Sequence, residues 1–301
     1  MGCCSGRIQK PMEDPNLIKI KQGHEIVDKT YFSSVASNYI SNKNNYYRKN
    51  FNVASVDSKH LNQELEELSF IRSNVNLEKL LKLLSSNTKI TMDEDVVLHS
   101  WAENPKTIGT LATIQLGIFA SDKDISHESS FTDAILKTGI VDKLLEFINS
   151  QERDKFEAAV LAISFLSENN ADIVETLIKK NALPALIRHM RDPKEGLKGT
   201  AALCCRNLYV ARPSVQQEFI QEQGSGLLIK LLRSEDSVTV FETILNLLDL
   251  ILDDEDTIQQ DVKQHLQSFD IVDELDRIIF DTSRYEQDTI NEAVKLKMLF
   301  N

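Results

Sequence analysis

The strongest constraint on the fold is a pattern that recurs every 42 residues. Three stretches, KTGIVDKLLEFI, KKNALPALIRHM and QEQGSGLLIKLL, align without gaps, and their shared reference positions are Gly139, Asn181 and Gln223. A fourth copy, SFDIVDELDRII, places Asp270 at the same position after 47 residues. Upstream, SNVNLEKLLKLL and TLATIQLGIF resemble one or two diverged copies, with an insertion around residues 122–130. A fixed period of this length is typical of a repeat architecture.

Each unit of the pattern predicts two or more helices. Leu or Ile fills the fifth and sixth positions after the first three reference residues, and a second apolar stretch follows: AVLAISFLS, AALCCRNLYV and TILNLLDLIL. Only 10 Gly and 6 Pro interrupt the 301 residues, which favours an all-α protein. Helices that are apolar on more than one face must bury themselves against neighbouring units. The sequence therefore predicts an all-α solenoid with a long concave surface.

The repeat pattern resembles the armadillo family. The unit reads G-x-[IVL]-x-x-L-[LIV]-x-x-[LIM], and the stretch GTAALCCRNLYV carries Asn207-Leu208 where the family has Asn-Leu or Asn-Ile. The resemblance implies a right-handed superhelical solenoid of about five repeats. We expect residues 61–301 to form this domain and residues 1–60 to form a flexible anchor and tether.

The resemblance also predicts which residues line the concave groove. Family members that hold extended basic peptides present a ladder of Trp and Asn on successive third helices. Here the Trp positions carry Leu161, Leu203 and Leu245, and the Asn positions carry Phe165, Asn207 and Asp249. One Asn and no Trp remain, so we expect a partner that buries apolar side chains rather than an import-type peptide. Packing of these leucines between repeats is the alternative.

An acidic run follows the third regular repeat. Its members are Asp253, Asp254, Glu255 and Asp256, and Asp249 lies one helical turn before the first of them. Such a run is typical of a solvated loop that caps the next helix. The alternative interpretation is a docking point for a basic partner.

The first ten residues, MGCCSGRIQK, resemble an N-terminal lipidation signal. Gly2 would receive a myristoyl amide, and Cys3 and Cys4 would receive palmitate; the sixth position is Gly6 instead of the usual Ser or Thr. One myristoyl chain binds a bilayer only marginally, so a palmitate would make the binding stable. Residues 1–60 carry 9 Lys or Arg and 5 Asp or Glu, which favours contact with anionic lipid, whereas the rest of the chain is strongly acidic.

These features together predict a monomeric, non-enzymatic scaffold held by acyl chains on the cytosolic face of an organelle, vesicle or plasma membrane. The combination is similar to the vacuolar armadillo proteins of yeast and the armadillo-repeats-only family of apicomplexan rhoptries. That resemblance implies organelle positioning through motor or adaptor partners. Two alternatives stay open: a soluble co-chaperone of the Hsp70 nucleotide-exchange type, and a structural component of the cytoskeleton or cilium.

The remaining sequence features argue against an enzyme. The six histidines are scattered, and the chain has neither an HExxH nor a GxxxxGK[ST] sequence. We therefore assign no catalytic residue, no metal ligand and no cofactor. The net charge of −12 argues against nucleic acid as a partner.

Overall fold

The protein is an all-α stack of helical units, as the repeat pattern predicts. The computed structural model describes residues 77–90, 101–121, 129–168, 170–253 and 255–300. The predicted domain boundary at residues 60 and 61 lies outside these ranges. Within them, the chain forms fourteen helices, and the only strand-like pairings are two isolated bridges.

The helices group into units of three. The first helices of the units are α7 (Ser129–Thr138), α10 (Ala171–Lys179), α13 (Pro213–Gln221) and α16 (Gln260–Gln267). The second helices are α4 (Leu77–Leu84), α8 (Ile140–Ile148), α11 (Leu183–His189), α14 (Gly224–Leu231) and α17 (Ile271–Phe280). The third helices are α5 (Ile108–Ser121), α9 (Arg153–Ser167), α12 (Glu195–Ala211), α15 (Ser237–Ile251) and α18 (Gln287–Met298).

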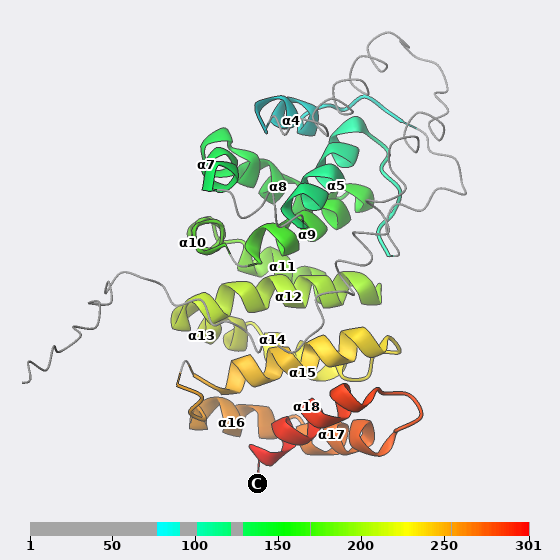
Figure 1. Ribbon diagram of the computed structural model, residues 1–301, viewed down its shortest axis with the longest axis vertical. Helices are drawn as coiled ribbons and strands as arrows, with labels where there is room; N and C mark the ends of the chain where they lie inside the picture. Colours follow the sequence, from blue (N-terminus) through cyan, green and yellow to red (C-terminus); the bar gives the residue numbers. More distant parts are fainter. Residues whose placement is uncertain (1–76, 91–100, 122–128, 169, 254, 301) are drawn as a thin grey trace, which may run out of the picture.

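The third helices form a ladder through the molecule. Figure 1 shows α9, α12 and α15 stacked one below the next, with α7, α10, α13 and α16 along one side of the stack. Each third helix packs directly on the third helix of the next unit, from α5 to α18. This arrangement of five second-and-third helix pairs confirms the predicted solenoid of about five repeats.

The 42-residue register corresponds to one backbone feature. All four reference residues, Gly139, Asn181, Gln223 and Asp270, adopt left-handed φ angles, of 79°, 57°, 65° and 55°. Each one ends a first helix and turns the chain into the second helix. After α10, the N–H of Ala182 donates to the carbonyl of Leu177 across Asn181, which is the Schellman arrangement that ends a helix.

The five extra residues before the last unit lie in the loop between α15 and α16. Leu252 pairs with Ile258 across this loop, and the N–H of Asp253 donates to the carbonyl of Thr257. The insertion therefore forms a small closed loop and leaves the helical stack intact.

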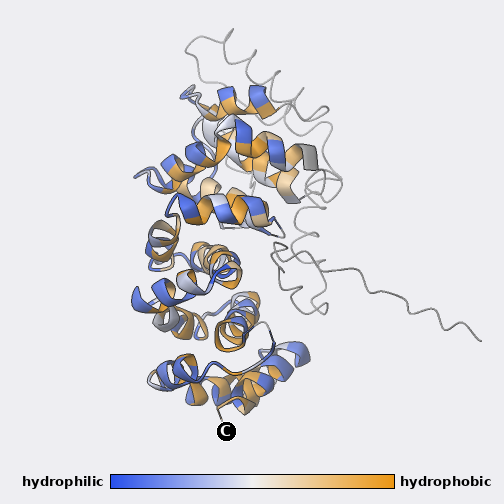
Figure 2. Cartoon of the chain, turned by 90° about the vertical axis from the view of Figure 1, so that its left-hand side faces the viewer, coloured by the Kyte–Doolittle hydropathy of each residue, from blue (hydrophilic) through white to orange (hydrophobic). Residues whose placement is uncertain are grey.

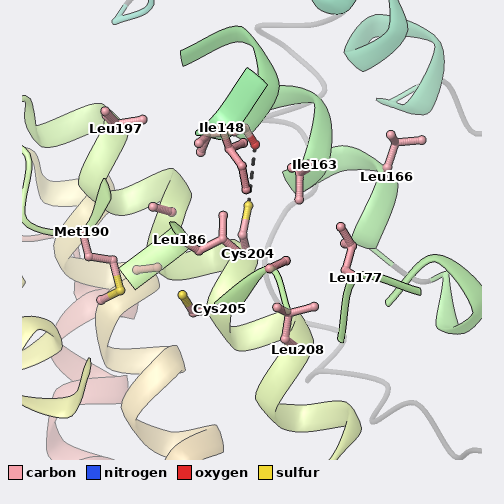
Figure 3. Close-up of a cluster of buried hydrophobic side chains, with 14 of the residues drawn as sticks. Ile148, Ile163, Leu166, Leu177, Leu186, Met190, Leu197, Cys204, Cys205 and Leu208 are labelled. Atoms are coloured by element: carbon pink, nitrogen blue, oxygen red, sulfur yellow. Dashed lines mark hydrogen bonds between the residues drawn. The ribbon is translucent and has the colours of Figure 1, made fainter. Parts of the chain in front are cut away.

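The core runs continuously between the units. Figure 2 shows hydrophobic and hydrophilic residues on each helix, as expected for amphipathic helices that stack on both sides. Figure 3 shows one section, in which α8, α9, α10, α11 and α12 meet around Cys204 and Cys205. Both cysteines are completely buried, and burial raises the pKa of each thiol, so both behave as packing residues.

Candidate protein-interaction groove

The six predicted groove residues lie on three neighbouring third helices. Leu161 and Phe165 are on α9, Leu203 and Asn207 are on α12, and Leu245 and Asp249 are on α15. Leu161 is buried, and the other five side chains are partly buried. Phe165 and Leu245 pack against the core, and Phe165 also lies beside Gly117 of α5.

Two polar contacts cross this surface from one repeat to the next. The Nδ2 of Asn207 donates to the Oγ of Ser167 on α9 over 2.9 Å. On its other side, α12 presents Arg206, whose Nε donates to the Oδ2 of Asp249 on α15 over 2.6 Å. Asn207 and Asp249 thus each bind a side chain of the adjacent repeat. The carboxylate of Asp249, which the sequence suggests as a docking point for a basic partner, is already paired with a cation of its own chain.

The sequence analysis missed a second carboxylate on the same face of α15. Glu242 lies three residues before Leu245 and seven before Asp249, so the three side chains share one face of the helix. It is partly buried, and burial raises the pKa of its carboxyl group against the opposing charge of Arg206. Among the described residues, none forms a hydrogen bond or ion pair with it.

A segment between α4 and α5 crosses the beginning of the groove. We call residues 101–107 the strap. The backbone N–H of Glu103 donates to Glu157 over 2.6 Å, and that of Lys106 donates to Asp154 over 3.0 Å, both on α9. The ring of Trp101 lies against Gly196 at the start of α12, where a Cβ atom would come within 2.4 Å of the ring. The strap therefore joins the third helices of two successive repeats.

Asp154 and Glu157, which hold the strap, are buried. Glu157 pairs with Arg153 and with Lys194, at 2.9 Å and 3.0 Å, and Arg153 also binds Asp192. The Oδ2 of Asp154 accepts from Thr110 as well as from the strap. The charge of Glu157 is thus compensated by cations of the same chain, whereas the Oδ1 of buried Asp154 has no hydrogen-bond partner among the described residues.

The acidic run forms part of the closed loop after α15. The Oδ1 of Asp253 accepts from the N–H groups of Glu255 and Thr257, which closes the loop on itself. Contrary to the sequence prediction, the acidic run does not cap the next helix, because the N-cap position of α16 is Gln259. Glu255 and Asp256 are exposed, and Asp254 lies outside the described residues.

The predicted lipidation residues Gly2, Cys3 and Cys4 also lie outside the described residues. Among the helices that the structure describes, none has the length and apolar character needed to span a bilayer. The same part of the chain contains no group of three His, Cys, Asp or Glu side chains that could hold a metal ion.

No family model and no curated protein matches this sequence. Solved structures do match. The armadillo-repeats-only protein from Plasmodium falciparum is 28% identical, with a TM-score of 0.69 over 82% of this chain and 100% of that one. A designed armadillo-repeat protein in complex with the peptide (KR)4 is 18% identical, with a TM-score of 0.62 over 82% of this chain and 95% of that one.

A structure from work on the interaction between cadherin and β-catenin is 13% identical, with a TM-score of 0.60 over 82% of this chain and 43% of that one. The two less similar structures share the fold with this chain. The chain is therefore an armadillo-type solenoid, and it resembles the Plasmodium protein.

Proposed function

We propose that this protein is an acylated adaptor that recruits protein partners to the cytosolic face of a membrane and thereby positions an organelle or vesicle. The observation that carries the proposal is the groove on α9, α12 and α15, which combines partly buried leucines with charged side chains. A solenoid of this kind presents an open, extended surface, which suits a partner chain better than a small substrate.

The proposed anchor is the sequence MGCC at the start of the chain. Two acyl signals would make residence on a bilayer stable, and the basic residues 1–60 would add attraction to anionic lipid. The resemblance of the sequence to the armadillo-repeats-only family implies a role in positioning organelles through motor or adaptor partners, and the chain shares its fold with the Plasmodium protein of that name.

Membrane fractionation tests the anchor. The full-length chain carrying a C-terminal tag is expressed in eukaryotic cells and fractionated by centrifugation. We expect wild type and the control Gly6→Ala in the membrane pellet and Gly2→Ala in the soluble fraction, because Gly2 carries the first acyl chain. A Gly2→Ala variant that pellets as well as wild type would overturn the anchor, and a soluble wild type would favour the co-chaperone alternative. Resistance of the pelleted protein to detergent would favour the structural alternative.

A second arm tests the scaffold separately. Leu203 is partly buried and, among the described residues, lies outside the group that packs against the core. Leu203→Glu should therefore keep the protein folded and membrane-bound while removing the partners that co-purify with wild type from a detergent extract. Unchanged co-purification would place the partner surface elsewhere.

A further inference from the structure

We propose that the chain forms a dimer in which two copies meet tail to tail, each through the outer surface of α17 and α18. We call this surface the end face, and its residues are Phe280, Asp288, Asn291, Val294, Lys295 and Met298. The proposal depends neither on the membrane anchor nor on the groove. It replaces the monomer that the sequence analysis predicts.

Exposed apolar side chains gather at one end of the solenoid. Among the described residues, only three large apolar side chains are exposed: Phe280, Val294 and Met298, at 79%, 38% and 67%. All three belong to the last unit that the structure describes, and Figure 1 shows α17 and α18 at the lower end of the stack. A terminal repeat of a soluble solenoid needs a polar outer surface. The end face departs from this rule, and exposed apolar patches mark interaction sites.

Phe280 occupies a position that reaches the following unit elsewhere in the molecule. It lies ten residues after its reference position, and the residues at the same place in the earlier units are Asn149, Arg191 and Arg233. The side chain of Asn149 accepts from Arg188 of the next unit over 3.2 Å. Arg191 donates to the carbonyl of Glu222 of the next unit over 3.0 Å. Arg233 donates to the carboxylate of Glu274 of the next unit over 2.8 Å.

Val294 and Met298 also occupy positions that are covered in the earlier units. They lie eight and twelve residues after the N-cap residue of α18. The corresponding residues on α9, α12 and α15 are Val160, Ala202 and Ile244 for the first position and Ser164, Arg206 and Leu248 for the second. All of these are buried except Arg206, whose guanidinium is paired with Asp249 of the next unit. The last unit therefore keeps large apolar side chains at positions of contact between units, but no described residue covers them.

The end face is one surface formed by two helices. The buried residues of α18, which packs on α15, are Thr289, Ile290, Ala293 and Leu296. Asn291, Val294 and Met298 follow one another at spacings of three and four residues and form a separate, exposed stripe along the helix. The Nζ of Lys297 pairs with the carboxylate of Asp276 and so holds α17 beside α18.

The charges on α18 identify a second copy as the partner. Asp288 and Lys295 are both exposed and lie seven residues, about two turns, apart on the same side of the helix. When two copies of α18 lie antiparallel about a twofold axis, Asp288 of each copy faces Lys295 of the other. Asp288 has no ion pair among the described residues, whereas Lys295 pairs with Glu292 of its own chain. Contact between identical ends thus brings opposite charges together twice and covers the apolar side chains.

The size of the end face predicts a reversible dimer. An aromatic side chain that becomes buried removes about 150–250 Å² of surface from water. Two copies of Phe280, Val294 and Met298 therefore form a contact in the range of small interfaces, below about 1,200 Å². We expect an equilibrium between monomer and dimer that shifts with protein concentration.

Sedimentation velocity at increasing protein concentration tests the proposal. The full-length chain is produced in bacteria that lack a myristoyl transferase, so that acyl chains cannot cause association. We expect the mass to rise from one copy to two, and Phe280→Ser and Met298→Glu should each weaken the dimer at least about tenfold. The control Gln217→Glu adds the same charge at an exposed position on α13 and should leave the dimer unchanged. Equal melting temperatures of the dilute proteins show that they are equally folded.

Charge reversal tests whether the partner is a second copy. Lys295→Glu should weaken the dimer several-fold, because it places like charges opposite each other at both ends of the contact. Adding Asp288→Lys in the same chain should recover most of this loss. The double variant does not restore the pair between Lys295 and Glu292, so the recovery reports the contact between copies.

Each other outcome contradicts a defined part of the proposal. A mass of one copy at every concentration would overturn the dimer. A dimer that Phe280→Ser and Met298→Glu leave intact would place the contact on another surface of the chain. Species larger than two copies would show that the end face binds a different surface of the next copy. A double charge variant without recovery would overturn the antiparallel arrangement of α18.

Discussion

The guanidinium of Arg206 on α12 donates to the carboxylate of Asp249 on α15, and the two side chains are only 19% and 16% exposed. This ion pair joins two successive repeats across the groove. The pair also means that Asp249, which stands out in the sequence, already has a partner. Glu242, on the same face of α15, has none among the described residues.

Asp249→Ala should lower the free energy of unfolding by about 2–4 kcal/mol, because it leaves a largely buried guanidinium without its counter-charge. The double variant Arg206→Met with Asp249→Leu should recover most of this loss, since it removes both charges and keeps apolar volume. Urea unfolding of the three proteins measures both effects. A single variant as stable as wild type would show that the pair contributes nothing to the stack.

Gln223→Gly should raise the free energy of unfolding by about 1 kcal/mol, because Gln223 holds a left-handed φ of 65° that glycine adopts without steric cost. The reciprocal variant is Gly139→Ala. A Cβ atom at Gly139 would meet nothing within 4 Å, so any loss of stability reports the backbone alone, and we expect about 1 kcal/mol. A lower melting temperature for Gln223→Gly, or a higher one for Gly139→Ala, would contradict the left-handed turns at these two reference positions.

Gly196→Ala should displace the strap, because the added Cβ atom would lie 2.4 Å from the ring of Trp101. Trp101 is the only tryptophan, so its emission reports the strap directly. We expect a red shift and faster quenching by acrylamide. Gly199→Ala, whose Cβ would come no closer than 3.2 Å to the side chain of Thr239, is the control and should leave the spectrum unchanged. An unshifted spectrum for Gly196→Ala would place Trp101 away from α12.

The stability of the protein should fall in mild acid because of His189. Its ring is buried against Phe156, and burial lowers its pKa below the ordinary value; Arg188 and Arg153 act in the same direction, while the bond to the carbonyl of Ile148 and the charge of Asp192 oppose it. Since the folded pKa is the lower one, this contribution is present above about pH 6.5 and is lost as the pH falls towards the folded pKa.

The loss from this one group cannot exceed about 1.4 kcal/mol per pH unit. Urea unfolding at pH 7.5 and at pH 5.5 measures it, and His189→Gln should lose less stability between the two than wild type does. An equal loss in both proteins would assign the acid sensitivity to other groups.

The sequence predicted those parts of the structure that recur. Gly139, Asn181 and Gln223 could be aligned without any structure because each repeat needs the same left-handed turn, and the local pattern therefore reports the fold. The placement of Leu203, Asn207 and Leu245 on third helices followed from the same register. The bond between Asn207 and Ser167 could not be predicted, because it depends on how far one repeat is rotated against the next.

Features that occur once were not predicted. Glu242 carries no signal in the sequence, because an acidic residue in the middle of a helix is usually exposed, and only the structure shows its partial burial and its missing partner. Trp101 lies outside the repeat register, and its contact with Gly196 could not be predicted because it joins residues almost a hundred positions apart. The lipidation of Gly2, Cys3 and Cys4 stays a prediction.

The strap gives the two ends of the solenoid different unfolding behaviour. In a simple stack each repeat is coupled only to its neighbours, so the ends can fray one unit at a time. The strap connects α4 and α5 of the first repeat, and it contacts α9 of the second repeat and α12 of the third. It therefore couples the first repeat to the third, which is not its neighbour. The first three repeats should consequently open as one cooperative block, whereas α16, α17 and α18 can open alone. In native-state hydrogen exchange, amides of α5, α9 and α12 should share a single opening free energy, higher than that of α18.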